Sequence, residues 1–154
     1  MRTIKFKGKC LSPEKGKEMA YGSLVTAQRC WILEHTHDDS FKSFIVAPAT
    51  VCQFTGFHDK NGKEIYEGDV LRSDEYPFSC AQYGTRDNYF GVVFYYEKEA
   101  TFGMMTVKNP ESGLIGIYDS VYSEITQEKF EDFEVVGNIH EEEWKQYGKY
   151  FQEE

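Results

Sequence analysis

Hydrophobic and polar residues alternate in short runs along most of the chain, and glycine or polar residues separate one run from the next. The runs are rich in β-branched and aromatic side chains, which favour strands. The pattern predicts strands at residues 4–6, 22–25, 30–33, 41–46, 51–57, 65–66, 70–71, 91–96, 101–107, 114–118 and 133–139. We therefore expect a mostly β fold, all-β or α+β, built of short antiparallel strands.

The strongest local signal is the tetrapeptide Asp59-Lys60-Asn61-Gly62, which lies between two apolar runs. Asn-Gly favours a tight hairpin turn because both residues tolerate positive φ. Glu67-Gly68-Asp69 predicts a second turn just before the next strand. We expect positive φ at Gly62, and we expect Asp69 to accept backbone N–H groups rather than to act as an acid or base.

Two segments show helical features. Residues 123–132 predict a turn or two of helix, with Ser123 as its N-cap. Residues 141–151 place Trp144, Tyr147 and Phe151 at three- and four-residue spacing, which predicts a short amphipathic helix. Because so short a helix is marginal in water alone, these aromatics are expected to dock, either on their own subunit or on a neighbour, and they form a candidate interface.

Length and composition fit a single domain. The chain has 154 residues, of which 40% are hydrophobic and 16% aromatic, enough for a packed core. Within it we distinguish an N-terminal β part at residues 1–49, an SH3-like β-barrel part at residues 50–139 and an acidic, aromatic helical tail at residues 140–154.

The net charge of −9 argues against a general nucleic-acid-binding surface, which would present clustered Lys and Arg. Acidic residues are concentrated near the C-terminus, whereas basic residues are concentrated near the N-terminus. Two interpretations stay open: the charges keep the protein soluble, or the opposite ends support head-to-tail self-association.

No segment reaches the ~20 apolar residues that span a bilayer, and no secretory signal is visible. The four cysteines, Cys10, Cys30, Cys52 and Cys80, show no paired spacing. We therefore expect free thiols in a reducing compartment and no membrane association.

Residues 35–39, His-Thr-His-Asp-Asp, are the one cluster with metal-ligand character. His35 and His37 alternate, as two ligands on one side of a strand would. They also lie in a predicted polar hairpin loop, where His and Asp are ordinary turn residues, and a solvated loop is the favoured interpretation. The sequence shows no nucleophile elbow and no phosphate-binding loop, so no catalytic residue or cofactor is expected.

A second cluster is aromatic. Tyr76, Phe78, Tyr83 and Tyr89 lie close together in the sequence, with two arginines nearby. Such residues can stack on single-stranded nucleic acid, or they can form a protein interface. Several acidic residues lie in the same stretch, so a protein interface is favoured over nucleic acid.

The hairpin run at residues 50–70 resembles the signature of the YopX family of phage and prophage proteins. Four further segments resemble that family in the expected order: residues 1–8, 19–24, 91–94 and 133–141. Two features depart from the family pattern, namely Cys52 at a position usually held by a small residue and the insert at residues 71–90. The resemblance implies a phage or prophage origin and implies no particular activity.

These observations lead to two functional hypotheses. The first is a non-enzymatic, self-associating protein–protein interaction module, a homo-oligomer whose further partner is an unidentified phage or host protein. The alternative is a nucleic-acid-binding accessory factor that uses the surface of a small β-barrel. In either case the resemblance implies that the protein acts in the cytoplasm of a bacterial host cell.

Overall fold

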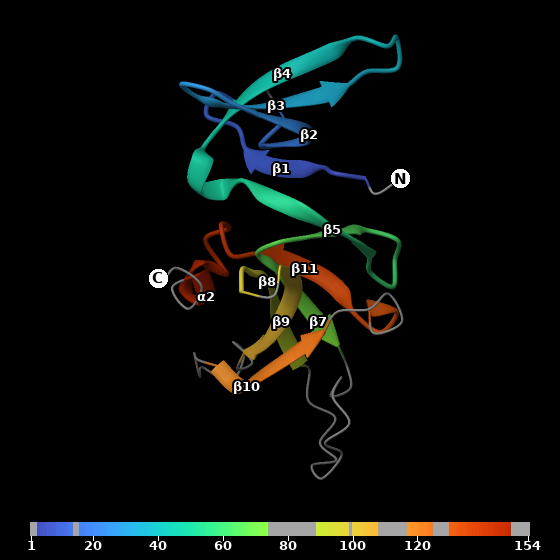
Figure 1. Cartoon of the computed structure of the whole chain (residues 1–154), viewed down its shortest axis with the longest axis vertical. Helices are drawn as coiled ribbons and strands as arrows, with labels where there is room; N and C mark the ends of the chain where they lie inside the picture. The colour runs from blue at the N-terminus through green and yellow to red at the C-terminus, as the bar shows by residue number, and fades with distance from the viewer. Residues whose placement is uncertain are drawn as a thin grey trace. The chain divides into compact units, whose positions relative to one another are not determined.

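The structure is a computed structural model that describes residues 3–13, 16–73, 89–98, 100–107, 117–124 and 130–148. The chain divides into two compact units, unit 1 at Met1–Gly56 and unit 2 at Phe57–Glu154. Each unit is built on an antiparallel sheet (Figure 1).

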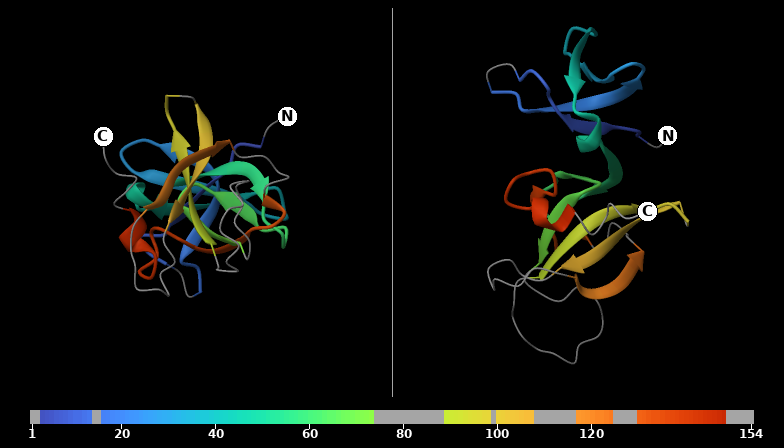
Figure 2. Two further views of the ribbon diagram at one scale, coloured as in Figure 1. Left: turned by 90° about the horizontal axis from the view of Figure 1, so that it is seen from below. Right: turned by 90° about the vertical axis from the view of Figure 1, so that its left-hand side faces the viewer.

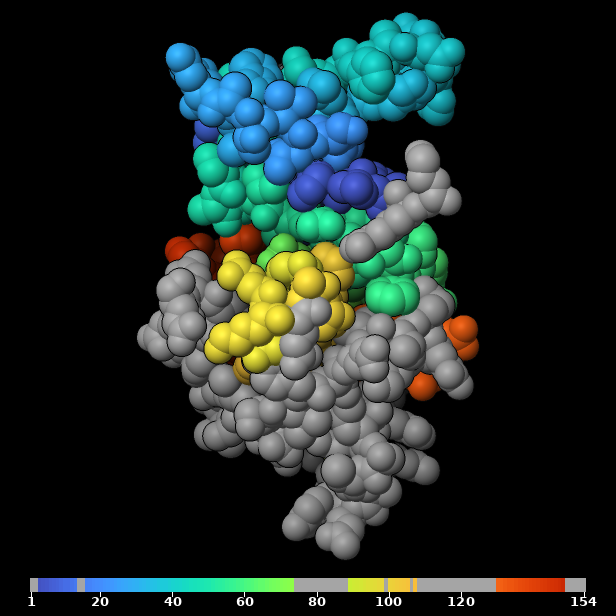
Figure 3. All heavy atoms as spheres, viewed as in Figure 1, coloured from blue at the N-terminus to red at the C-terminus, as the bar shows by residue number. Residues whose placement is uncertain are grey.

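The sheet of unit 1 has the strand order β4-β3-β2-β1-β5, and β6 is added after β5 through the hairpin that joins them. Its elements are β1 (Phe6–Lys9), β2 (Met19–Thr26), β3 (Cys30–His35), β4 (Phe41–Val46), the 3-10 helix η1 (Pro48–Thr50), β5 (Cys52–His58) and β6 (Glu64–Tyr66). The last two residues of β5 and all of β6 belong to unit 2. The hairpin of β3 and β4 extends beyond β1, as the ribbon and space-filling views show (Figures 1 and 3).

The unit 1 sheet curls so that the end of β4 meets the segment that follows β1. The Leu11 N–H donates to the Ile45 carbonyl at 2.9 Å, and the Ala47 N–H donates to the Lys9 carbonyl at 2.9 Å. The end of β4 is thereby joined to the segment that follows β1, and the curvature is visible in the side view (Figure 2). The buried core of the curled sheet consists of Cys10, Ala20, Ile32 and Val46.

The sheet of unit 2 has the order β10-β9-β8-β7-β11. Its strands are β7 (Asp69–Ser73), β8 (Tyr89–Tyr96), β9 (Thr101–Val107), β10 (Ile117–Glu124) and β11 (Glu134–Asn138), and α2 (Lys145–Gly148) follows them. Neighbouring residues of one strand point to opposite faces, and both faces of this sheet are buried. Leu71 and Val93 belong to one core cluster, whereas Val70 and Val92 belong to the other.

The mostly β class predicted from the sequence is confirmed. In the residues that the structure describes, the unit 2 sheet is open rather than closed into a barrel, with β10 and β11 as its edges. The C-terminal helix is present, and in the described residues it covers Lys145–Gly148.

The prediction that a helix begins at Ser123 was wrong. Ser123 and Glu124 form the end of β10 and pair with β9. Strand pairing outweighs the weak capping signal at this position. Among the described helices, none is both long and apolar enough to cross a bilayer.

Candidate functional site

The outward face of the unit 1 sheet carries a row of large apolar side chains. Val25 on β2 lies opposite Trp31 on β3, and Trp31 lies opposite Ile45 on β4. Leu11 comes next, because its N–H donates to the Ile45 carbonyl where the sheet closes. Opposed residues of antiparallel strands point to the same face, so Leu11, Ile45, Trp31 and Val25 form a continuous line, here called the apolar row.

The register also shows that the apolar row points away from the core. Leu24, Ile32 and Phe44 occupy the neighbouring positions on the same three strands and lie opposite one another. All three contribute to the core of unit 1. Because side chains alternate between the two faces of a strand, the apolar row lies on the other side of the sheet.

Several side chains of this face are open to solvent. Leu11 is 60% exposed and Val25 is 43% exposed, whereas Trp31 and Ile45 are half-buried. Tyr21 and Phe41 lie on the same face and are also exposed. A contiguous exposed apolar surface is a feature of interaction sites, and a partly buried Trp is a frequent energetic centre of such sites.

The strand positions that point outward on β2, β3 and β4 include no carboxylate. These positions are Met19, Tyr21, Ser23, Val25, Trp31, Leu33, His35, Phe41, Ser43 and Ile45, and together they are called the outer face. A surface of this composition favours an apolar or aromatic partner surface over a cationic one.

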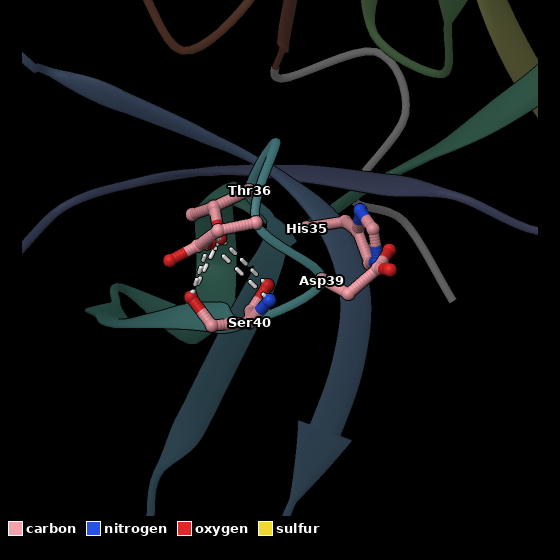
Figure 4. Close-up of polar contacts among 5 residues, drawn as sticks. His35, Thr36, Asp39 and Ser40 are labelled. Carbon is pink, nitrogen blue, oxygen red and sulfur yellow. Dashed lines mark hydrogen bonds and ion pairs between the residues drawn. The ribbon is translucent and has the colours of Figure 1, made fainter.

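The loop at the tip of the β3–β4 hairpin is held by hydrogen bonds among its own residues (Figure 4). The Thr36 N–H donates to the Ser40 carbonyl at 2.9 Å. One carboxylate oxygen of Asp38 accepts from the hydroxyls of Thr36 and Ser40. The hydrogen bond from the Thr36 side chain, followed by those from Ser40, lowers the pKa of Asp38 to about 2.

The two histidines of this hairpin have different surroundings. His35 Nε2 lies 3.5 Å from Asp39 Oδ1, and its ring meets Phe41 edge-on at 5.2 Å between centroids. His37 is exposed in the loop. Among the residues that the structure describes, no group of three or more His, Cys, Asp or Glu side chains is placed to hold a metal ion.

The hairpin turn at residues 59–63 is joined to strand β11 of unit 2 by a hydrogen bond. Asp59 Oδ1 accepts from the N–H groups of Asn61 and Lys63 at 2.8 and 2.9 Å, and Oδ2 accepts from the Val135 N–H at 2.9 Å. Gly62 has φ 77°, as predicted, whereas Asn61 does not share the positive φ. Asp59 therefore fixes the turn and ties it to β11.

Asp69 plays a parallel role at the second turn. Its Oδ2 accepts from the Tyr66 N–H at 2.8 Å, which confirms that this residue accepts a backbone N–H, and its Oδ1 accepts from Asn138 Nδ2 at 2.9 Å. Asn138 Oδ1 in turn accepts from the His140 N–H at 3.0 Å. The buried side chains of Asp69 and Asn138 thus hold the backbone at Tyr66 and His140 in place.

Two aromatic residues of the tail, Trp144 and Tyr147, lie in the core of unit 2. Trp144 and Tyr147 are 5% and 0% exposed and share a cluster with Phe90. The ring centroids of Trp144 and Phe90 are 5.7 Å apart. Phe151 lies outside the described residues. Docking of this segment on a neighbouring subunit therefore stays a prediction.

The candidate aromatic surface of the insert falls mostly outside the described part of the chain. Tyr76, Phe78 and Tyr83 are outside the described residues. Tyr89 is the first residue of β8 and is half-buried. The use of these residues in binding stays a prediction.

Sequence reasoning missed the apolar row. Its members come from four segments, and only the register of the strands shows that they adjoin. A signal was nevertheless present: Val25, Trp31 and Ile45 each lie beside a core residue in a run that is apolar on both faces. A strand with one face in water alternates apolar and polar residues, so such runs indicate a second buried or binding face.

Comparisons with known proteins give a family match and likenesses to solved structures. A family model described as "YopX protein" matches residues 5–143. The crystal structure of protein EF1440 from Enterococcus faecalis is 19% identical, covers 91% of this chain and 95% of its own, and has a TM-score of 0.44. No curated protein matches the chain.

Proposed function

The chain belongs to the YopX protein family, and we propose that this member is a non-enzymatic protein–protein interaction module that associates with itself. The observation that supports the proposal is the apolar row on the outer face of unit 1. Covering such a row removes apolar area from water, which stabilises a complex by about 25 cal/mol per Å² before the cost of association.

The charge of the two units restricts where a partner binds. Unit 1 holds eight of the 17 Lys and Arg residues and five of the 26 Asp and Glu residues, a formal charge of +3. The formal charge of the whole chain is −9, so unit 2 carries a formal charge of −12. Strong negative charge keeps a surface soluble and separate from like surfaces, so unit 1 is the better site for self-association.

The proposal includes the cellular setting that the family resemblance implies. The protein would be of phage or prophage origin and would act in the cytoplasm of a bacterial host. Its further partner would be a phage or host protein that contacts the self-associated form.

Light scattering across a concentration series tests the self-association. We expect a mass above the 17.9 kDa of one chain. Leu11→Glu places a charge in the apolar row at an exposed position, and we expect it to lower the mass. Ile4→Glu is the matched control, because Ile4 is 65% exposed and lies outside the row. A mass of 17.9 kDa at every concentration contradicts the proposal.

A second candidate function rests on a separate observation, the aromatic side chains of the outer face. Tyr21, Trp31 and Phe41 project from a unit with a positive formal charge, a combination found on single-strand-binding sheets. Fluorescence anisotropy with single-stranded and duplex oligonucleotides at low salt distinguishes the two functions. Binding that weakens steeply with added salt, and that Trp31→Ala abolishes, supports this alternative.

A further inference from the structure

We propose that the apolar row binds the same row of a second copy, with the two outer faces stacked around a two-fold axis. This inference rests on the proposed self-association and names its contact surface and symmetry. It differs from a head-to-tail arrangement, in which the row would contact another part of the neighbouring chain.

The distribution of exposed apolar side chains supports a contact of like with like. In the described part of the chain, six large hydrophobic side chains are exposed. Four of them lie on the outer face or in the apolar row, namely Leu11, Tyr21, Val25 and Phe41. The other two stand apart, because Ile4 precedes β1 and Tyr95 lies on β8 of unit 2. The apolar surface that best matches the row is therefore the row itself.

The charges favour the same arrangement. The outward strand positions of β2, β3 and β4 carry no carboxylate, and His35 is their one imidazole. Over these three strands, stacking of two such faces brings no carboxylate and no lysine against its counterpart, although Lys7 on the neighbouring β1 lies opposite Tyr21 and points to the same face. Contact of the row with unit 2 of another copy would instead remove water from a surface with a formal charge of −12. Desolvating carboxylates against an apolar row is unfavourable.

Pairing of the sheets through the edge of β4 is less favourable than stacking of their faces. At the C-terminal end of β4, the Ile45 carbonyl already accepts from the Leu11 N–H. Along the remaining stretch, antiparallel pairing of two copies would bring Lys42 close to Lys42 of the second copy. Lysine on an edge strand opposes such pairing. Stacked sheets, by contrast, bury their apolar faces about 10 Å apart and need no free edge.

Photo-cross-linking tests the contact directly. Ser23 lies on the outer face opposite Leu33, and it is exposed. A benzoylphenylalanine at position 23, in an equal mixture of ¹⁴N- and ¹⁵N-labelled copies, marks intermolecular cross-links by their mixed isotope pattern. We expect those cross-links to fall on β2, β3 or β4 of the other copy. Val25→Glu should reduce their yield on the order of tenfold or more, because it buries a charge in the interface.

The outcomes separate this inference from the proposed function. Association by light scattering with cross-links on unit 2, or with none between copies, overturns the two-fold contact and leaves self-association standing. A mass of one chain at every concentration overturns both. Ile4→Glu should change neither mass nor cross-links, since it lies outside the row.

Discussion

Gly137 of β11 lies directly against the indole of Trp144: a Cβ at residue 137 would stand 2.1 Å from Nε1 and 2.3 Å from Cδ1. The register of β11 with β7 shifts between Val135 and Gly137, so a bulge brings this glycine under the ring. In the described part of the chain, Trp144 Nε1 is buried without a hydrogen-bond partner. The tail is therefore held against the sheet by close packing of Trp144 on Gly137 and not by a hydrogen bond of the indole N–H.

Gly137→Ala should destabilise unit 2. The added methyl cannot fit beside Trp144, and an overpacked site costs about 1–3 kcal/mol or more in the free energy of unfolding. Urea denaturation measures the loss. Gly137→Ala combined with Trp144→Leu supplies the control, since a smaller side chain at 144 should make the two losses less than additive. Full additivity contradicts the proposed contact.

Truncation after Glu142 should lower the stability of the subunit rather than its oligomeric mass. It removes Trp144 and Tyr147, both buried in the core of unit 2. Deletion of one large buried aromatic costs about 3–5 kcal/mol. Thermal unfolding and light scattering are the measurements. A lower mass with unchanged melting would show instead that the tail docks on a neighbouring subunit.

Gly62→Val should cost about 1–3 kcal/mol of stability through backbone strain at positive φ. Nothing lies within 4 Å of a Cβ built at this position, so the cost is one of conformation and not of packing. Gly62→Asn is the matched control, because asparagine tolerates the left-handed region and should lose less. Equal melting temperatures for the wild type and Gly62→Val would contradict the hairpin geometry.

Asp59→Ala should destabilise unit 2 by about 2–4 kcal/mol, because it leaves the N–H groups of Asn61, Lys63 and Val135 without this acceptor. Asp59→Asn keeps one carbonyl oxygen for the turn but loses an acceptor. We therefore expect Asp59→Asn to lose less stability than Asp59→Ala, as measured by chemical denaturation. A loss for Asp59→Asn as large as that for Asp59→Ala would show that the remaining amide oxygen does not hold the turn.

The hairpin tip should show a pH dependence at acidic pH. Because folding lowers the pKa of Asp38 from 3.8 to about 2, its contribution to the loop is complete above pH 3.8 and is lost as pH falls through about 2. NMR titration of the Asp38 carboxyl carbon measures this value. Thr36→Val removes the hydrogen bond that lowers the pKa of Asp38 most, so it should raise that pKa. His37→Gln is the control and should leave the pKa of Asp38 unchanged.

Local signals in the sequence carry much of the fold. Asp59 and Gly62 are recognisable because turn chemistry depends on neighbouring residues alone. Strand β4 is recognisable from its apolar run. Leu11, by contrast, falls outside every predicted strand, and it joins the apolar row only because the sheet curls until its N–H reaches Ile45. That pairing joins residues far apart in the sequence, which a local pattern does not specify.

The start of the tail helix was also beyond local reasoning. The spacing of Trp144 and Tyr147 predicts one apolar face, and both residues are in fact buried. The α-helix nevertheless begins only at Lys145, four residues after the start that the pattern predicts. The contact of Trp144 with Gly137 depends on a bulge in β11, and a bulge leaves no clear mark in the sequence.

The position of β1 has a consequence for the order in which unit 1 folds. β1 pairs with β2 on one side and with β5 on the other, although it comes first in the chain. During synthesis the hairpins of β2, β3 and β4 can form from adjacent residues, whereas β1 reaches its second partner only after β5 has left the ribosome. Long-range pairing of this kind slows folding. Pulsed hydrogen exchange should therefore protect the amides shared by β2 and β3 before those shared by β1 and β5, and the reverse order would show that the first strand nucleates the unit.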